Sequence, residues 1–87
     1  MDDRAITAKQ LVELSKKHLE EQQRCVARQR ELVARYERNG DEARLSGARI
    51  VLERLQKRLA QMTTAHAAAE EHLSKLTADE PSIEKFV

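Results

Sequence analysis

The sequence predicts an all-α protein, an antiparallel two-helix coiled-coil hairpin that pairs into a four-helix bundle. Three observations support this fold class. Charged residues make up 36% of the 87-residue chain and aromatic residues only 2%, and strong helix formers dominate the rest. Apolar residues recur every seven positions in both halves of the chain. The phase of this repeat changes at Asn39-Gly40-Asp41, where the residue types favour a turn.

The first helix is expected at residues 3–38. Its seam, the line of heptad a and d positions that packs against a second helix, runs along its whole length. The a positions are Ala5, Val12, Leu19, Val26 and Val33, and the d positions are Ala8, Ser15, Gln22, Gln29 and Tyr36. Two interpretations of Gln22 and Gln29 stay open: they select the register or the oligomeric state of the helices, or they extend to the rim of the seam.

The turn is expected at residues 39–41. Gly or Asn just past a helix accepts the left-handed conformation that ends it, and Asp41 is a good N-cap for a following helix. If the first seam continued at seven-residue steps, Gly40 and Gly47 would occupy apolar a positions. A hairpin accommodates this change of phase more readily than a continuous coiled coil does.

The second helix is expected at residues 42–78, since Pro81 cannot continue it and disfavours helical geometry in the residue before. Its seam holds over five heptads. The a positions are Leu45, Leu52, Leu59, His66 and Leu73, and the d positions are Ala48, Leu55, Met62, Ala69 and Leu76. The two helices form a hairpin domain of residues 1–80, followed by a C-terminal tail at 81–87.

The two seams fit together in one antiparallel register. When paired residue numbers sum to 81, each layer sets an a residue against a d residue, as antiparallel packing requires. In this register Tyr36 meets Leu45 near the turn, and Ser15 meets His66 further along.

A second apolar line accompanies the first seam at the g positions of the first helix. This flank and the facing edge of the second helix give the predicted interface residues Leu11, His18, Cys25, Leu32 and Val51. The opposite edge of the hairpin is polar. Because two helices bury few side chains, we expect the flank to bind another helix, most simply in a homodimer. In the alternative, the flank only widens the intramolecular seam of a monomer.

Charge is distributed unevenly along the chain. Residues 24–58 hold ten Lys or Arg against five Asp or Glu, a net of +5, whereas residues 1–23 carry −1 and residues 59–87 carry −3. An antiparallel dimer would set each basic tip near the acidic end of its partner. The alternative function is binding of nucleic acid or an anionic surface through the tip. The residues for it are Arg28, Arg35, Arg38, Arg44 and Arg49.

Catalytic and metal-binding patterns are not found in the sequence. We see no nucleophile–base pair, paired catalytic carboxylates or phosphate-binding Gly-rich loop, so we expect no enzyme, no cofactor and no metal. His18 and His66 fall about one turn apart on facing helices, but the favoured interpretation of His66 is a seam residue hydrogen-bonded to Ser15 or to backbone. For Cys25 we favour a small buried apolar residue over a redox-sensitive thiol.

The run RQRELVARYERNGDEARLSGARIVLERLQKRLAQM, preceded by KKHLEEQQRCVA, resembles uncharacterised small helical-hairpin proteins of alphaproteobacteria, especially rhizobia. The resemblance covers roughly residues 17–66, with NGDEA where those proteins have a Gly-His-Asp type of turn. It implies a bacterial cytosolic protein and no particular activity. The acidic start and the lack of a long apolar run likewise predict a cytoplasmic protein without membrane contact. We therefore expect a non-enzymatic, self-associating interaction module, a small adaptor or regulatory protein whose other protein partner the sequence does not name.

Overall fold

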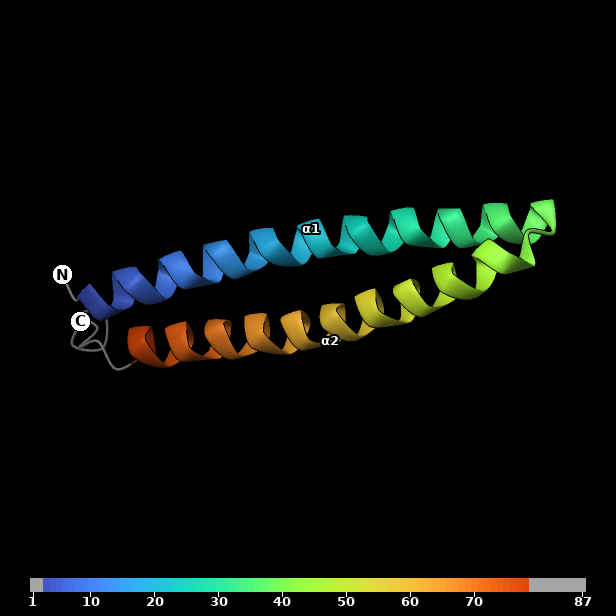
Figure 1. Cartoon of the computed structure of the whole chain (residues 1–87). Coiled ribbons are helices and arrows are strands. Elements are labelled where there is room, and N and C mark those ends of the chain that lie inside the picture. The colour runs from blue at the N-terminus through green and yellow to red at the C-terminus, as the bar shows by residue number, and fades with distance from the viewer. Residues whose placement is uncertain (1–2, 79–87) are drawn as a thin grey trace, which may run out of the picture.

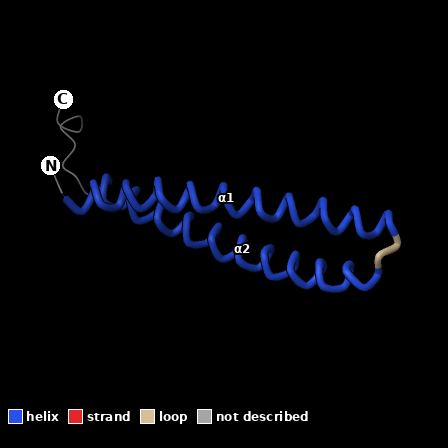
Figure 2. Tube along the Cα trace, turned by 45° about the horizontal axis from the view of Figure 1, so that its top comes forward, coloured by secondary structure: helices blue, strands red, loops and turns tan. Residues whose placement is uncertain are grey.

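The computed structural model describes residues 3–78, which form two long helices packed side by side in opposite directions. Helix α1 covers Asp3–Asn39 and helix α2 covers Glu42–Ala78, each with 37 residues. Figures 1 and 2 show the two helices lying along each other from the loop to the Asp3 end of α1 and the Ala78 end of α2. The molecule is a rod of 68 × 20 × 14 Å. The predicted all-α helical hairpin is confirmed, while the predicted tail at 81–87 lies outside the described residues.

The loop between the helices is a Schellman turn followed directly by an N-cap. Gly40 has a φ of +67°. Its N–H donates to the carbonyl of Glu37 at 3.2 Å, and the N–H of Asp41 donates to the carbonyl of Tyr36 at 3.0 Å. The Oδ1 atom of Asp41 then accepts the N–H of Arg44 at 3.3 Å. The chain therefore reverses direction at Gly40 and Asp41, and Asn39, which was expected in the turn, is the last residue of α1.

The core is a single thin seam. Every a and d position predicted from the heptads is buried or half-buried. The most buried residues are Ala8, Gln22, Val26, Val33 and Ala48. Even Val26, at 2% exposure, is not completely covered, and no larger side chain in the described part of the chain is better buried. Burial of so few large side chains leaves a hairpin of this size only marginally stabilised by its own core.

The Ser15–His66 layer fixes the register of the hairpin. The Oγ atom of Ser15 lies 2.7 Å from Nδ1 of His66, within hydrogen-bond distance, across 51 residues of sequence. The same hydroxyl donates to the carbonyl of Val12 at 2.9 Å. On its other side the imidazole Nε2 lies 3.0 Å from Oε1 of Glu70. The predicted pairing, with residue numbers summing to 81, and the predicted role of His66 as a hydrogen-bonded seam residue are confirmed.

Two glutamine side chains hold the same register closer to the loop. The Nε2 atom of Gln22 donates to the carbonyl of Leu55 at 3.0 Å, and Nε2 of Gln29 donates to the carbonyl of Ala48 at 3.0 Å. A helix carbonyl points toward the residue four positions later, so the Gln22 amide lies level with Leu59, its predicted partner. Gln22 is only 8% exposed. The interpretation in which these side chains extend to the rim is wrong, because both bind the facing backbone.

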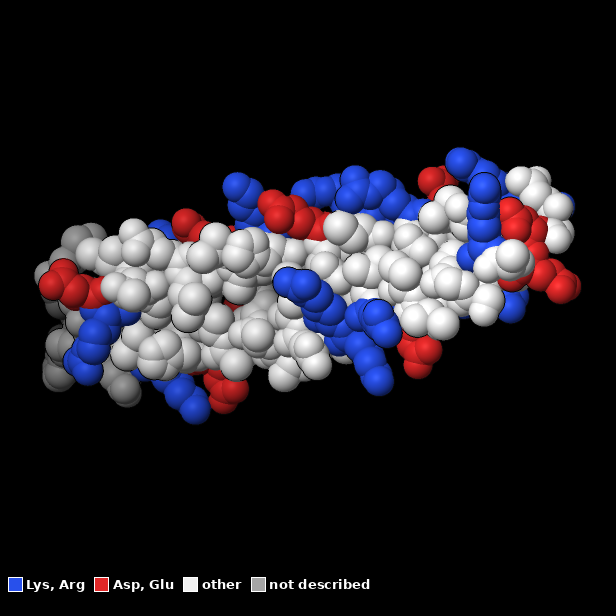
Figure 3. Space-filling model, in the orientation of Figure 1, with Lys and Arg blue, Asp and Glu red and all other residues white. Residues whose placement is uncertain are grey.

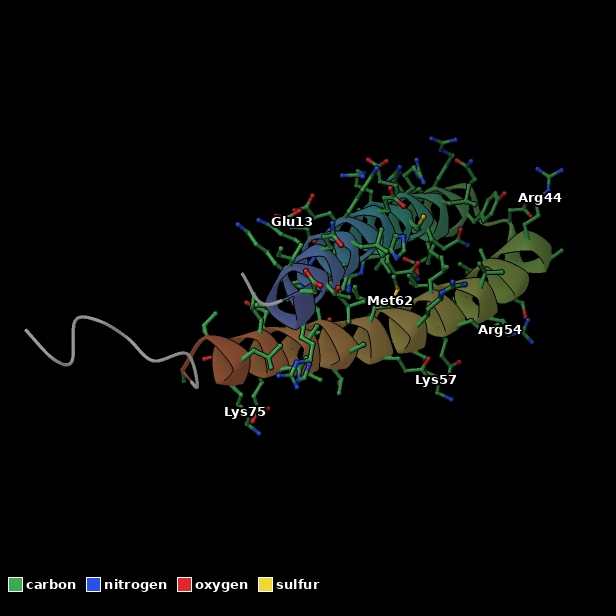
Figure 4. All side chains as sticks on the ribbon, turned by 90° about the vertical axis from the view of Figure 1, so that its left-hand side faces the viewer. Glu13, Arg44, Arg54, Lys57, Met62 and Lys75 are labelled. Carbon is green, nitrogen blue, oxygen red and sulfur yellow. The ribbon has the colours of Figure 1, made fainter. Side chains whose placement is uncertain are left out.

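Charged side chains lie mainly on the outer faces. Figure 4 shows Met62 between the two helices, whereas Arg54, Lys57 and Lys75 point away from the seam. Polar outer faces and a narrow apolar stripe are the expected pattern of a helix with one buried side. Within residues 3–78, neither helix is apolar over a stretch long enough to cross a membrane.

Candidate protein-interaction surface

One edge of the hairpin exposes a line of apolar side chains, here called the flank. It consists of the predicted residues Leu11, His18, Cys25 and Leu32 of α1 with Val51 of α2. Leu11 is 52% exposed and Val51 44% exposed. His18 is also exposed, while Cys25 and Leu32 are half-buried. The structure therefore shows accessible apolar surface at the predicted positions, without showing what binds there.

Three shallow hollows follow the flank from the open end of the hairpin toward the loop. The first lies between Leu11 and His72 and has a volume of about 360 Å³. The second lies beside His18 and has a volume of about 330 Å³, and the third, of about 380 Å³, lies between Leu32 and Leu55. Each hollow has one wall from α1 and one from α2. The edge is thus an interrupted groove that runs between the helices, and not a row of separate side chains.

Leu14 belongs to the same surface, although heptad reasoning did not include it. It is 51% exposed and lies three residues after Leu11 and four before His18, which places it on the same side of α1. The heptad pattern could have shown this. The c positions each lie three residues after a g position of the flank, so they form the next line of side chains on its outer side; they are Leu14, Glu21, Arg28 and Arg35. Ile50 is also 50% exposed, but it occupies an outward f position of α2, away from the flank.

The flank changes in charge along its length. Near the open end Leu11 and Leu14 are exposed, and Asp3, Arg4 and His72 line the hollow beside Leu11. Nearer the loop, Arg28 and Arg35 line the hollow beside Leu32, and Arg58 lines the neighbouring hollow. On the face in Figure 3, uncharged surface runs along both helices and is interrupted near the middle by Lys or Arg side chains. The loop half of the flank therefore combines apolar groups with a small excess of positive charge, because Glu21 and Glu31 line the same hollows as the three arginines.

The arginines proposed for anion binding do not form one open cluster. All five are exposed, namely Arg28, Arg35, Arg38, Arg44 and Arg49. Arg49 places Nη2 3.1 Å from Oε1 of Glu37, and Arg44 places Nε 3.6 Å from Oδ2 of Asp41. Figure 4 shows Arg44 at the loop end. Two of the five cations are thus paired with carboxylates within the tip itself, which reduces the charge directed at an external anion.

The histidines of the hairpin do not meet at one site. His66 is held by Ser15 and Glu70, and its side chain is only 14% exposed. His18 instead lies on the flank, where it lines the middle hollow with Glu21. Among residues 3–78 there is no group of three or more His, Cys, Asp or Glu side chains that could hold a metal ion.

Cys25 lies at the junction of two hollows of the flank. Its Sγ atom accepts a hydrogen bond from Nη2 of Arg28 at 3.3 Å, and the residue is half-buried. The side chain is thus less covered than the expected buried position, because the edge of α1 on which it lies has no facing helix in the hairpin.

In comparisons with known proteins, no protein family, curated protein or solved structure matches the chain. The resemblance to the alphaproteobacterial hairpin proteins therefore stays a prediction.

Proposed function

We propose that the chain is a non-enzymatic helical interaction module that associates with itself through the flank, forming a homodimeric four-helix bundle. The observation that carries this proposal is the apolar groove beside a thin core. Leu11, Leu14 and Val51 are each 44–52% exposed along one edge, next to hollows that a helix from another molecule would fill. Burying this edge would double the apolar seam that each hairpin has by itself.

The exposed area supports association. The chain exposes 7085 Å², whereas a compact monomer of its mass of 10.0 kDa exposes about 5,200 Å² by the usual scaling. A stable interface of standard size takes about 800 Å² from each partner. The elongated hairpin therefore has ample surface for such an interface, and the flank and its border hold Leu11, Leu14 and Val51, three of the five large apolar side chains exposed within residues 3–78.

The proposed role is binding, as a small cytoplasmic adaptor or regulatory protein, and the dimer is the form that would present its outer faces to a further protein. Nucleic acid or an anionic surface bound through the arginine tip is the alternative. The pairing of Arg44 and Arg49 with neighbouring carboxylates favours the dimer over this alternative. Anion binding would also weaken steeply with added salt, which apolar self-association would not.

Light scattering over a range of concentrations tests the proposal. We expect a mass near 20 kDa, twice 10.0 kDa, which falls toward the monomer on dilution. Leu11→Glu should raise the dissociation constant at least tenfold, about 1.4 kcal/mol, because it buries a carboxylate in the interface. Ile50→Glu is the matched control, since Ile50 is 50% exposed and Leu11 is 52% exposed, but Ile50 faces outward.

Both variants should keep the helical circular dichroism of the wild type, because neither side chain is part of the seam. A wild type that is monomeric at every concentration would refute self-association. An equal effect of the two substitutions would show that the flank is not the interface.

A further inference from the structure

The two hairpins have two symmetric ways to set flank against flank. A two-fold axis along the rod places loop beside loop, with α1 opposite α2 of the second copy. A two-fold axis across the rod places loop beside open end, with α1 opposite α1 of the second copy and running in the opposite direction. The two arrangements bury the same surface, so the groups along the flank decide between them.

We infer that the hairpins pair head to tail, α1 against α1, an inference that rests on the proposed self-association. In the loop half of the flank, Arg28 and Arg35 line the hollow beside Leu32, together with the single carboxylate of Glu31. Loop beside loop would bring these cations against those of the second copy, and like charges at an interface are strongly unfavourable. Head-to-tail pairing sets them instead against the Leu11 and Leu14 end.

The spacing on α1 suits this arrangement. Leu11, His18, Cys25 and Leu32 are placed symmetrically about the point between His18 and Cys25. A two-fold axis through that point sets Leu11 of each copy opposite Leu32 of the other. Leu11 is 52% exposed and protrudes, whereas Leu32 is half-buried beside the hollow of about 380 Å³ that it shares with Leu55. The exposed leucine of one copy therefore meets a cavity of the other, as a knob meets a hole.

The charge along the chain agrees with the head-to-tail arrangement. Residues 24–58 carry a net charge of +5, whereas the described residues toward the open end, 3–23 and 59–78, carry 0 and −1. With loops at opposite ends of the dimer, each basic tip lies near the less basic end of the second copy. This places opposite net charges side by side, which favours one orientation over the other.

Thiol cross-linking between separately purified variants tests the orientation. In a Cys25→Ser background, Leu11→Cys and Leu32→Cys each carry one thiol. A short bismaleimide links thiols within its reach, and the two positions lie about 31 Å apart along one helix at 1.5 Å per residue. We expect an equimolar mixture of the two variants to give at least tenfold more covalent dimer than either variant alone.

Two other results would overturn the inference. Cross-linking of Leu11→Cys with itself would show the two open ends side by side, and hence loop beside loop. Efficient linkage of Leu11→Cys to His72→Cys would show α1 opposite α2, with loop beside loop. Light scattering on the same samples before cross-linking tests self-association separately from orientation. A dimer with the wrong linkage refutes only the orientation, whereas a monomer refutes the proposed self-association as well.

Discussion

Alanine substitution of the two glycines should move stability in opposite directions. Gly40 has a φ of +67° in the turn, whereas Gly47 lies inside α2 with helical geometry. A Cβ atom added at either position would have no atom within 4 Å. Steric clash with other groups is thus absent at both sites, and the backbone conformation alone determines the sign of the effect.

The magnitudes follow from that conformation. Left-handed geometry costs an alanine about 1–2 kcal/mol, and the reduced freedom of the unfolded chain offsets about half of this, so Gly40→Ala should destabilise by about 1 kcal/mol. In a helix interior alanine is better than glycine by about 0.5–1 kcal/mol, so Gly47→Ala should stabilise by that amount. For a domain of this size the two melting temperatures should differ by about 6–16 °C.

Thermal unfolding followed by circular dichroism at equal protein concentrations measures this difference. Repeating the melts at several concentrations accounts for association, which otherwise shifts the transition. Gly40→Asn is a useful third variant, because Asn tolerates the left-handed conformation and should recover part of the loss. If Gly40→Ala stabilises the chain as Gly47→Ala does, position 40 is helical. The chain would then be one long helix, and the hairpin would be refuted.

Three further substitutions probe the seam by thermal unfolding. Val26→Ala should cost about 2 kcal/mol, from two buried methyl groups and the cavity they leave at a residue 2% exposed, while Ile50→Ala, 50% exposed, should change stability little. Ser15→Ala should cost about 1 kcal/mol by removing a hydrogen-bond partner of His66, and in a His66→Leu background the same change should cost almost nothing. Gln22→Leu should raise the melting temperature but give mixed oligomers in light scattering, since a polar seam residue specifies one pairing at the expense of stability; an unchanged single species would contradict that role.

Much of the fold follows from sequence because the heptad pattern is long and the turn is chemically distinct. The apolar residues of α2 follow the same heptad phase over five heptads, and this determines which side of the helix is buried. The change of phase at Gly40 then requires the chain to reverse. The pairing of Ser15 with His66 follows from these two constraints alone, and their hydrogen bond of 2.7 Å shows that the layers align as expected.

The surface was less predictable, because exposure depends on what lies beside a helix and not on its own periodicity. Leu14 was missed since a c position normally faces solvent, and only its neighbours Leu11 and His18 place it on the flank. The ion pair of Arg49 with Glu37 is also not apparent from net charge, because it joins two helices across the tip. The number of cations in the tip therefore overestimates how many of them are available to bind an external anion.

The seam and the flank make different contributions to the molecule. The seam contains Gln22 and a Ser15–His66 layer where leucine would stabilise more, so it specifies register better than it provides stability. The apolar area that would compensate for this low stability lies on the flank, outside the seam. If the flank is covered by a second copy, folding and association become one equilibrium, and the stability of the chain depends on its concentration. A thin seam interrupted by polar layers, beside a grooved apolar edge, is therefore the pattern expected of a chain that completes its core by binding.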